Sequence, residues 1–199
     1  MDALNKLPDT PAHMDWNDAE KYCTWLSKVS GLPFALPTEA QWEYAARSRG
    51  QFIIAGTNSG VLEMDGIQRG INISGSLDRE EFARKMGLSS GLYTAMPVDR
   101  YPPNPLGLYD MAGNGYDWVK DWYDPDYYKN SPVVDPQGPE KPVFKRREGI
   151  YDTEEKYQKV LRGAGTSGPF NGLTIARSKR SPDTKVTFVM TVRCVVNSI

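Results

Sequence analysis

Hydrophobic and polar positions near the start of the chain recur with the period of a helix. The apolar positions of segment 15–31 share one helical face: Ala19, Tyr22, Cys23, Leu26 and Val29. Asp15 precedes this pattern as an N-cap, and Gly31 follows it as a C-terminal stop. The pattern therefore predicts a helix between these two residues, with Cys23 pointing inward.

A second helix is predicted by the capping signal in LPTEAQWEYAARS, residues 36–48. Thr38 is an N-cap, and Gln41 completes a Thr-x-x-Gln capping box. The expected buried face of this helix holds Trp42, Ala45 and Ala46.

The remainder of the chain has weaker periodicity. Residues 50–105 and 121–143 are rich in turn-forming residues such as glycine, serine and proline, with one helical pattern at 77–87. Residues 185–196, KVTFVMTVRCVV, alternate as a half-buried strand that carries Cys194. We expect one α+β domain over residues 1–199, with little regular secondary structure and long ordered loops.

Composition narrows the class of protein. The chain has 199 residues, 39% hydrophobic and 25% charged, with a net charge of -1, which is typical of a folded domain. This balance gives no argument for nucleic-acid binding, and we interpret the basic run 145–149 as a solvated loop. No apolar run approaches the roughly 20 residues of a membrane span.

Two features stay ambiguous when the residues are taken alone. Cys23 and Cys194 lie near opposite ends of the chain, and their spacing does not distinguish a disulfide from two buried thiols. The stretch GLYDMAGNGYDW, residues 107–118, combines two acids with three glycines and an asparagine. It could form a turn, a cation site or the floor of an active site.

Several blocks, taken in order, closely resemble the formylglycine-generating enzyme (sulfatase-modifying factor) family. These blocks are DWNDAEKYCTWLS, LPTEAQWEYAAR, NPLGLYDMAGNGYDW, DWYDPDYY, SPVVDPQGP and VLRGAG. The resemblance implies a variant of the C-type-lectin fold, with a small twisted sheet, two helices and long ion-stabilised loops. Members of the family carry an additional N-terminal segment before the first block, and here only about fourteen residues precede it.

The resemblance also implies a structural disulfide. In the family, a cysteine of the first helix bonds to a cysteine after the final strand, and the matching residues here are Cys23 and Cys194. Because disulfides persist in oxidising compartments, we expect an extracytoplasmic protein, periplasmic or secreted.

The stretch 107–118 matches a calcium loop of the family. The implied ligands are the side chains of Asp110 and Asp117 and the backbone carbonyls of Gly113 and Gly115. Calcium prefers six to eight such oxygens, and glycine allows the sharp bends that direct carbonyls inward. We therefore interpret the stretch as a structural calcium site.

A second family calcium site would use Asn72. Here Ser90 stands where the family has an aspartate, so this second site is expected to be weak.

The family's catalytic centre is missing from the sequence. Formylglycine-generating enzymes oxidise a substrate cysteine with two thiols that hold copper(I), a soft ion. The two thiol positions fall here at about Gly168 and Leu173, and the family's substrate-contacting serine is replaced by Gly165. The single histidine, His13, excludes a multi-histidine iron site like that of related sulfur–carbon bond-forming enzymes. We expect no copper.

An intact scaffold without this centre favours a non-catalytic protein that binds another protein. Five residues are predicted to form the binding surface: Gly165, Thr166, Ser167, Phe170 and Asn171. The resemblance makes an immunity or inhibitor protein plausible, with a secreted toxic enzyme as partner. Two alternatives remain: a copper-independent enzyme acting on a small molecule or peptide, and a lectin-like ligand-binding module.

Overall fold

The structure is a computed structural model that describes most of the chain. The described residues are 9–61, 63–64, 68–69, 77–87, 95–143, 157–164, 173–185 and 190–197.

Helix α1 spans Trp16–Ser30 and has the predicted ends. The Asp15 carboxylate accepts a hydrogen bond from the backbone N–H of Asp18 (2.9 Å), and Gly31 ends the helix at φ 73°. The buried face is narrower than the sequence predicts. Cys23 is buried as expected, but the exposed fractions of Tyr22 and Val29 are 43% and 61%, because only the line through Ala19 and Cys23 meets the sheet.

Helix α2 spans Glu39–Ala46, and both hydrogen bonds of the predicted capping box are present. Trp42 and Ala46 are buried, whereas Ala45 is only half-buried. The sequence did not single out Glu39, whose side chain is completely buried.

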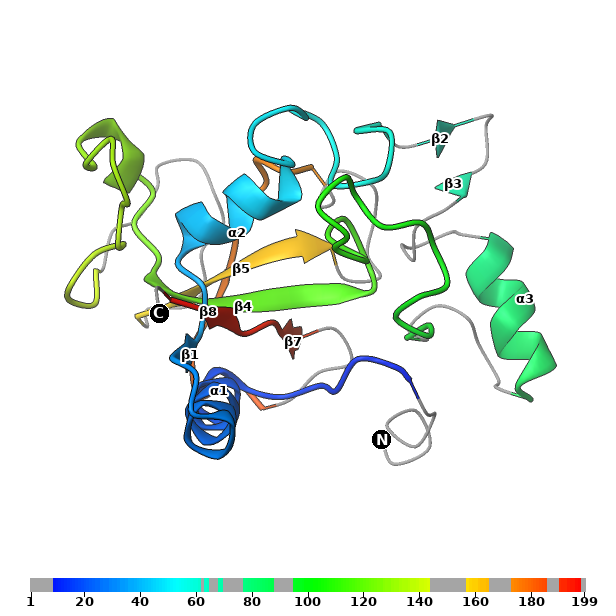
Figure 1. The fold of residues 1–199 in the computed structure, drawn as a ribbon, viewed down its shortest axis with the longest axis horizontal. Coiled ribbons are helices and arrows are strands. Elements are labelled where there is room, and N and C mark those ends of the chain that lie inside the picture. Colours follow the sequence, from blue (N-terminus) through cyan, green and yellow to red (C-terminus); the bar gives the residue numbers. More distant parts are fainter. Residues whose placement is uncertain are drawn as a thin grey trace.

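A four-stranded sheet lies at the centre of the fold (Figure 1). Its strand order is β6-β5-β4-β7; β5 and β6 run antiparallel to their neighbours, and β7 runs parallel to β4. These four strands are β4 (Gly115–Trp122), β5 (Lys159–Ala164), β6 (Ser178–Arg180) and β7 (Met190–Val192). The smaller elements are β1 (Phe34–Ala35), β2 (Glu63–Met64), β3 (Gln68–Arg69), α3 (Leu77–Lys85), η2 (Tyr127–Lys129) and β8 (Val195–Val196). The arrangement is the predicted α+β class, and α3 confirms the helical pattern at 77–87.

The prediction of a single strand over residues 185–196 is wrong for residues 190–196, which the structure describes. The chain leaves β7 after Val192 and enters β8 at Val195, so Cys194 lies between two strands. β7 pairs with β4 in the central sheet, whereas β8 pairs with β1 in a separate two-stranded sheet. The apolar alternation continues through both strands, which is why the pattern does not reveal the change of sheet.

Helices α1 and α2 cover opposite faces of the sheet (Figure 1). On one face, Tyr116 and Trp118 of β4 pack with Ala19 and Cys23 of α1. On the other face, Val119 packs with Trp42 and Ala46 of α2. Successive residues of β4 therefore contribute to two separate apolar layers.

Polar side chains of β4 and β5 lie under α2 and form an ionic cluster. Glu39 Oε1 accepts hydrogen bonds from Arg162 Nη1 and Arg177 Nε, both at 2.7 Å, and its Oε2 accepts from Arg177 Nη2 at 2.8 Å. Arg162 also donates to Glu43 Oε2 at 2.8 Å. On β4, Asp121 Oδ2 accepts from the backbone N–H of Glu39 at 2.8 Å. These contacts tie α2 to β4, to β5 and to the segment before β6.

Cys23 and Cys194 form the disulfide that the family resemblance implies, with their Cα atoms 5.6 Å apart. The bond links α1 to the segment between β7 and β8 across 171 positions of sequence. It consumes both cysteines of the chain.

None of the helices in the described ranges combines the length and the apolar character that a bilayer crossing demands.

Removal of the disulfide is predicted to destabilise the fold. The double substitution Cys23→Ala/Cys194→Ala frees a long loop in the unfolded chain, and we expect it to lower the free energy of unfolding by about 2–5 kcal/mol. Denaturant unfolding of wild type and variant, with and without reductant, measures this loss. Alkylation of two free thiols in the untreated protein would contradict the bond itself.

Neutralising Glu39 is predicted to be more harmful than any surface charge change. Glu39→Gln leaves two arginines without their shared counter-charge inside the fold, and we expect a loss of about 3–5 kcal/mol. Denaturant unfolding measures the loss. The control is Glu81→Gln, which breaks an exposed pair with Lys85 and is expected to leave the unfolding midpoint unchanged. Equal effects of the two substitutions would contradict the role of the cluster.

Candidate functional site

The stretch 107–118 divides into a tight loop and the first half of the central strand. The interpretation of the whole stretch as a loop is wrong, because β4 already begins at Gly115. The buried acids Asp117 and Asp121 interrupt the expected apolar alternation of this strand, so its pattern resembles a polar loop.

The loop is held by Asn114. Its side-chain amide accepts from the backbone N–H of Met96 (2.8 Å) and donates to the carbonyl of Met96 (3.0 Å). The same amide donates to Asp110 Oδ2 at 3.0 Å. Asp110 and Asn114 both have left-handed backbone conformations, with φ values of 56° and 66°. The amide of Asn114 therefore fixes both the loop and the orientation of Asp110.

Asp110 is a half-buried carboxylate. Desolvation raises its pKa from 3.8 to about 7, and the hydrogen bond from Asn114 opposes this rise only in part. No hydrogen bond to Asp110 Oδ1 is observed within the described residues. A cation that contacted this oxygen would favour the ionised form, as a calcium ligand requires.

Asp117 has a different environment. Its Oδ2 accepts from Trp42 Nε1 (2.9 Å) and Arg193 Nε (2.5 Å), and its Oδ1 accepts from Thr191 Oγ1 (2.9 Å). Sequence reasoning missed Arg193, although it directly precedes Cys194 and is therefore held beside β4. Since Arg193 already neutralises Asp117, this carboxylate fits a calcium ion less well than Asp110 does.

Three of the four implied calcium ligands border one cavity, and Gly115 is not among them. Asp110, Gly113 and Asp117 line one cavity of about 480 Å³, together with Thr191 and Arg193. Gly115 lies at the start of β4, where its φ is 146° and an added Cβ would lie 2.5 Å from Thr191 Cγ2. The described residues contain no cluster of three or more acidic, histidine or cysteine groups suited to a metal. A calcium ion here would therefore depend on Asp110 and on backbone carbonyls.

The second predicted calcium residue, Asn72, lies outside the described residues, as does Ser90. The five predicted binding-surface residues, Gly165, Thr166, Ser167, Phe170 and Asn171, lie outside them too. The structure does describe where this segment begins and ends. Ala164 packs against Ala55, and Leu173 forms a β-bridge with the same residue.

Apolar side chains gather beside those two ends. We call the set of Tyr44, Ile53, Ile54, Tyr128 and Ile175 the isoleucine–tyrosine patch; each of these residues is at least 42% exposed. Thr174 joins the two isoleucine segments, since its N–H donates to Ile54 O (2.9 Å) and its Oγ1 donates to Ile53 O (2.6 Å). Tyr44, Tyr128 and Ile175 line a cavity of about 370 Å³.

Comparisons with known proteins identify the family. Residues 2–198 match the model of the sulfatase-modifying factor enzyme 1-like domain. The formylglycine-generating enzyme of Streptomyces coelicolor is 34% identical over 178 residues, which are 88% of this chain and 49% of that enzyme. The inactive Cα-formylglycine-generating enzyme 2 of Bos taurus is 33% identical over 121 residues, 59% of this chain and 35% of that protein.

A solved structure shows the same fold. The structure of PvdO from Pseudomonas aeruginosa matches with a TM-score of 0.61 and 25% identity, over 94% of this chain and 62% of that one. The chain thus spans half or less of the length of these two curated relatives. With its matching blocks, its disulfide and its fold, the chain belongs to the sulfatase-modifying factor family, the family of the formylglycine-generating enzymes.

Proposed function

We propose that this chain is a non-catalytic member of its family that binds another protein. The observation that carries the proposal is the isoleucine–tyrosine patch beside both ends of segment 165–172. Exposed apolar surface of this kind marks interaction sites, and tyrosine and isoleucine supply large contact area. The patch extends the binding surface predicted for Gly165–Asn171 onto residues that the structure describes.

The state of the cysteines supports a non-catalytic role. A thiol pair able to hold copper(I) needs two free cysteines, whereas both cysteines of this chain are joined in the disulfide. Leu173, at one of the two family thiol positions, pairs through its backbone with Ala55 instead. The inactive bovine relative is a precedent for a family member without activity.

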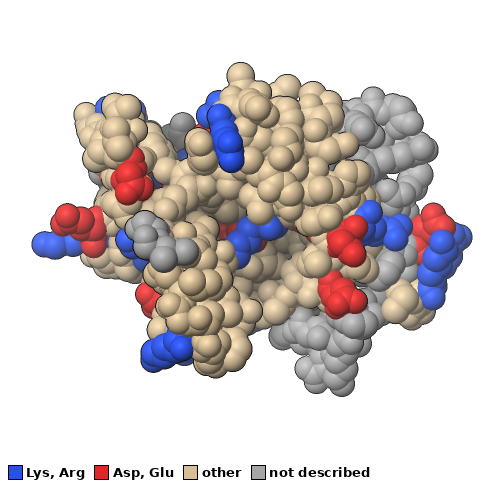
Figure 2. Space-filling model, viewed as in Figure 1, with Lys and Arg blue, Asp and Glu red and all other residues tan. Residues whose placement is uncertain are grey.

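The disulfide supports an extracytoplasmic location, because such bonds persist in oxidising compartments. The partner is then a protein met in the same compartment. We propose a secreted enzyme or toxin, which this chain would neutralise as an immunity or inhibitor protein. Figure 2 shows that the charged side chains on one face of the molecule are scattered among neutral residues, which favours a mixed protein interface over a polyanion.

We further propose that calcium stabilises the loop before β4. Asp110 would hold the ion with its free Oδ1, and the carbonyls of Gly113 and Gly115 would complete the inner contacts. The Asp117 carboxylate would also bind the ion if Arg193 no longer donated to Asp117 Oδ2. In this role the ion neutralises the half-buried Asp110 carboxylate and holds the loop in place.

The protein-binding proposal is tested by capture from the extracytoplasmic fraction of the source cell, read by mass spectrometry. We expect one stoichiometric partner, bound at least about tenfold more weakly by Tyr44→Ser/Ile175→Ser, because interface aromatic residues commonly contribute more than 1 kcal/mol. The matched control is Val133→Ser/Val134→Ser, which removes apolar side chains that are even more exposed and do not belong to the patch. Equal loss in the control would contradict the patch. If the chain captures no protein but captures a small molecule that it converts, this result would favour the copper-independent enzyme.

The calcium proposal is tested by thermal unfolding with calcium and with chelator. We expect chelation to lower the melting temperature of wild type, and to have little effect on Asp110→Asn, which lacks the ionised ligand. Identical melting temperatures of wild type in both buffers would contradict a bound ion.

The pH dependence of the chelated protein gives a separate check on Asp110. Because its pKa is raised from 3.8 to about 7, the folded state keeps a proton that the unfolded state loses between these values. Stability from this group is therefore highest at low pH, falls as pH rises through that interval and levels off above about 7. We expect Asp110→Asn to flatten this part of the profile in chelator. An unchanged profile would contradict a raised pKa of Asp110 in the calcium-free protein.

A further inference from the structure

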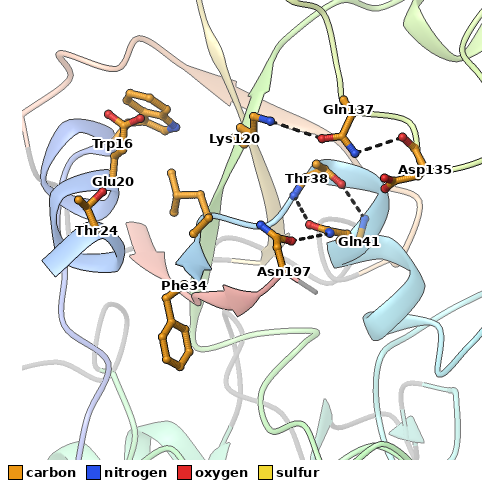
Figure 3. A pocket seen from close by; sticks show the side chains of 12 residues that line it. Trp16, Glu20, Thr24, Phe34, Thr38, Gln41, Lys120, Asp135, Gln137 and Asn197 are labelled. Carbon is orange, nitrogen blue, oxygen red and sulfur yellow. Dashed lines mark hydrogen bonds between the residues drawn. The ribbon is translucent and has the colours of Figure 1, made fainter. Parts of the chain in front are cut away.

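A further cavity lined by described residues lies away from the two sites above. It has a volume of about 590 Å³ and opens between α1, β1, the start of α2 and the end of β4 (Figure 3). This volume lies within the range of small-ligand pockets. Neither the calcium loop nor the isoleucine–tyrosine patch contributes a residue to it.

Two large apolar side chains line this cavity. They are the buried Leu36 and the half-buried Trp16 of α1. The indole N–H of Trp16 donates to the carbonyl of Val119 (2.9 Å), and the ammonium of Lys159 lies 4.0 Å from the centre of its ring. Val119 and Lys159 thus hold Trp16 in place, and neither of them lines the cavity.

The rim offers acceptors on both sides. Glu20 comes from α1 and Asp135 from the loop on the opposite side (Figure 3). Neither carboxylate makes a hydrogen bond or ion pair within the described residues. Carboxylates are strong acceptors, so both are available to a ligand.

Donors border the same space. Lys120 Nζ makes a single long contact, 3.4 Å from Gln137 Oε1, which leaves two of its three N–H groups available. Asn197 uses its Oδ1 to accept from Gln41 Nε2 (3.0 Å), and its own amide N–H groups point to no described partner. Bonds among these rim residues hold them in position, as Figure 3 shows.

This balance of charge narrows the class of ligand. With Glu20 and Asp135 against Lys120, the rim carries a net charge of about -1, which disfavours phosphates and other anions. The ammonium of Lys120 between the two carboxylates disfavours polycations. Hydroxyl groups donate and accept at once and suit mixed rims of this kind, while the C–H faces of a sugar ring can pack on Leu36 and Trp16.

We propose that this cavity binds a neutral saccharide of one or two rings, through Glu20, Asp135, Lys120 and Asn197. The site is independent of the partner surface and of the calcium loop, and its failure would leave both proposals standing.

The test is calorimetric titration of the disulfide-intact chain with three neutral disaccharides: maltose, cellobiose and N,N′-diacetylchitobiose. We expect at least one to bind with a Kd of about 1 mM or tighter. Glucuronic acid and spermidine serve as the anionic and cationic comparators, and we expect neither to bind.

A pair of matched variants locates the binding. Glu20→Gln/Asp135→Asn removes the two rim carboxylates with little change of shape, and we expect binding weakened about tenfold or more. Asp18→Asn/Asp183→Asn removes the same charge from exposed acids outside the cavity and is expected to bind like wild type. Equal melting temperatures of both variants and wild type would show that the fold is unaffected.

Three results would overturn the proposal. The first is that none of the three disaccharides binds saturably at about 20 mM. The second is that spermidine binds and the disaccharides do not, which would identify a cation site. The third is equal weakening in the two variants, which would place the binding elsewhere.

Discussion

Glu39 lies between the guanidinium groups of Arg162 and Arg177, with almost no exposure to solvent, and much of the fold depends on this arrangement. This arrangement joins the first turn of α2, the antiparallel strands β4 and β5, and the segment before β6. Arg162 also lies 5.0 Å from the ring of Trp42, whose indole N–H donates to Asp117. The ionic cluster under α2 is therefore connected through one tryptophan to the strand that borders the candidate calcium loop. Desolvating these charges is costly, and their mutual pairing offsets that cost only while every partner is present.

Local sequence signals predicted the helices well, because the determinants of helix ends are themselves local. The N-cap at Asp15, the left-handed Gly31 and the Thr38–Gln41 capping box could all be read from a few adjacent residues. The pairing of residues across the sheet could not be predicted in this way. Asp117 and Asp121 lie inside the fold beside distant donors, Arg193 and Thr191 for Asp117 and the N–H of Glu39 for Asp121 Oδ2, and no local pattern contains that information. The central strand was therefore interpreted as a loop, and the segment carrying Cys194 as one strand instead of two.

The candidate site, too, could be predicted from the sequence only in part. The residues grouped by family resemblance, Asp110, Gly113 and Asp117, do line one cavity. Their chemistry differs in a way that the sequence pattern hides: Arg193 donates to Asp117, whereas Asp110 is a half-buried acid with a raised pKa. The patch around Tyr44 and Ile175 could not be anticipated either, since the exposure of its side chains depends on how residues 53–55 and 173–175 lie together. Both cysteines of the chain form the structural disulfide, and exposed apolar side chains lie beside the ends of segment 165–172.

The most direct test of this account is a competition titration of the disulfide-intact protein with copper(I) under anaerobic conditions, against a chromophoric chelator. We expect the chelator to keep all the copper, because the two cysteines of the chain are bonded to each other and the family thiol positions hold other residues. Transfer of one equivalent of copper(I) to the protein, with the disulfide still intact, would contradict it and return the chain to the enzymes of its family.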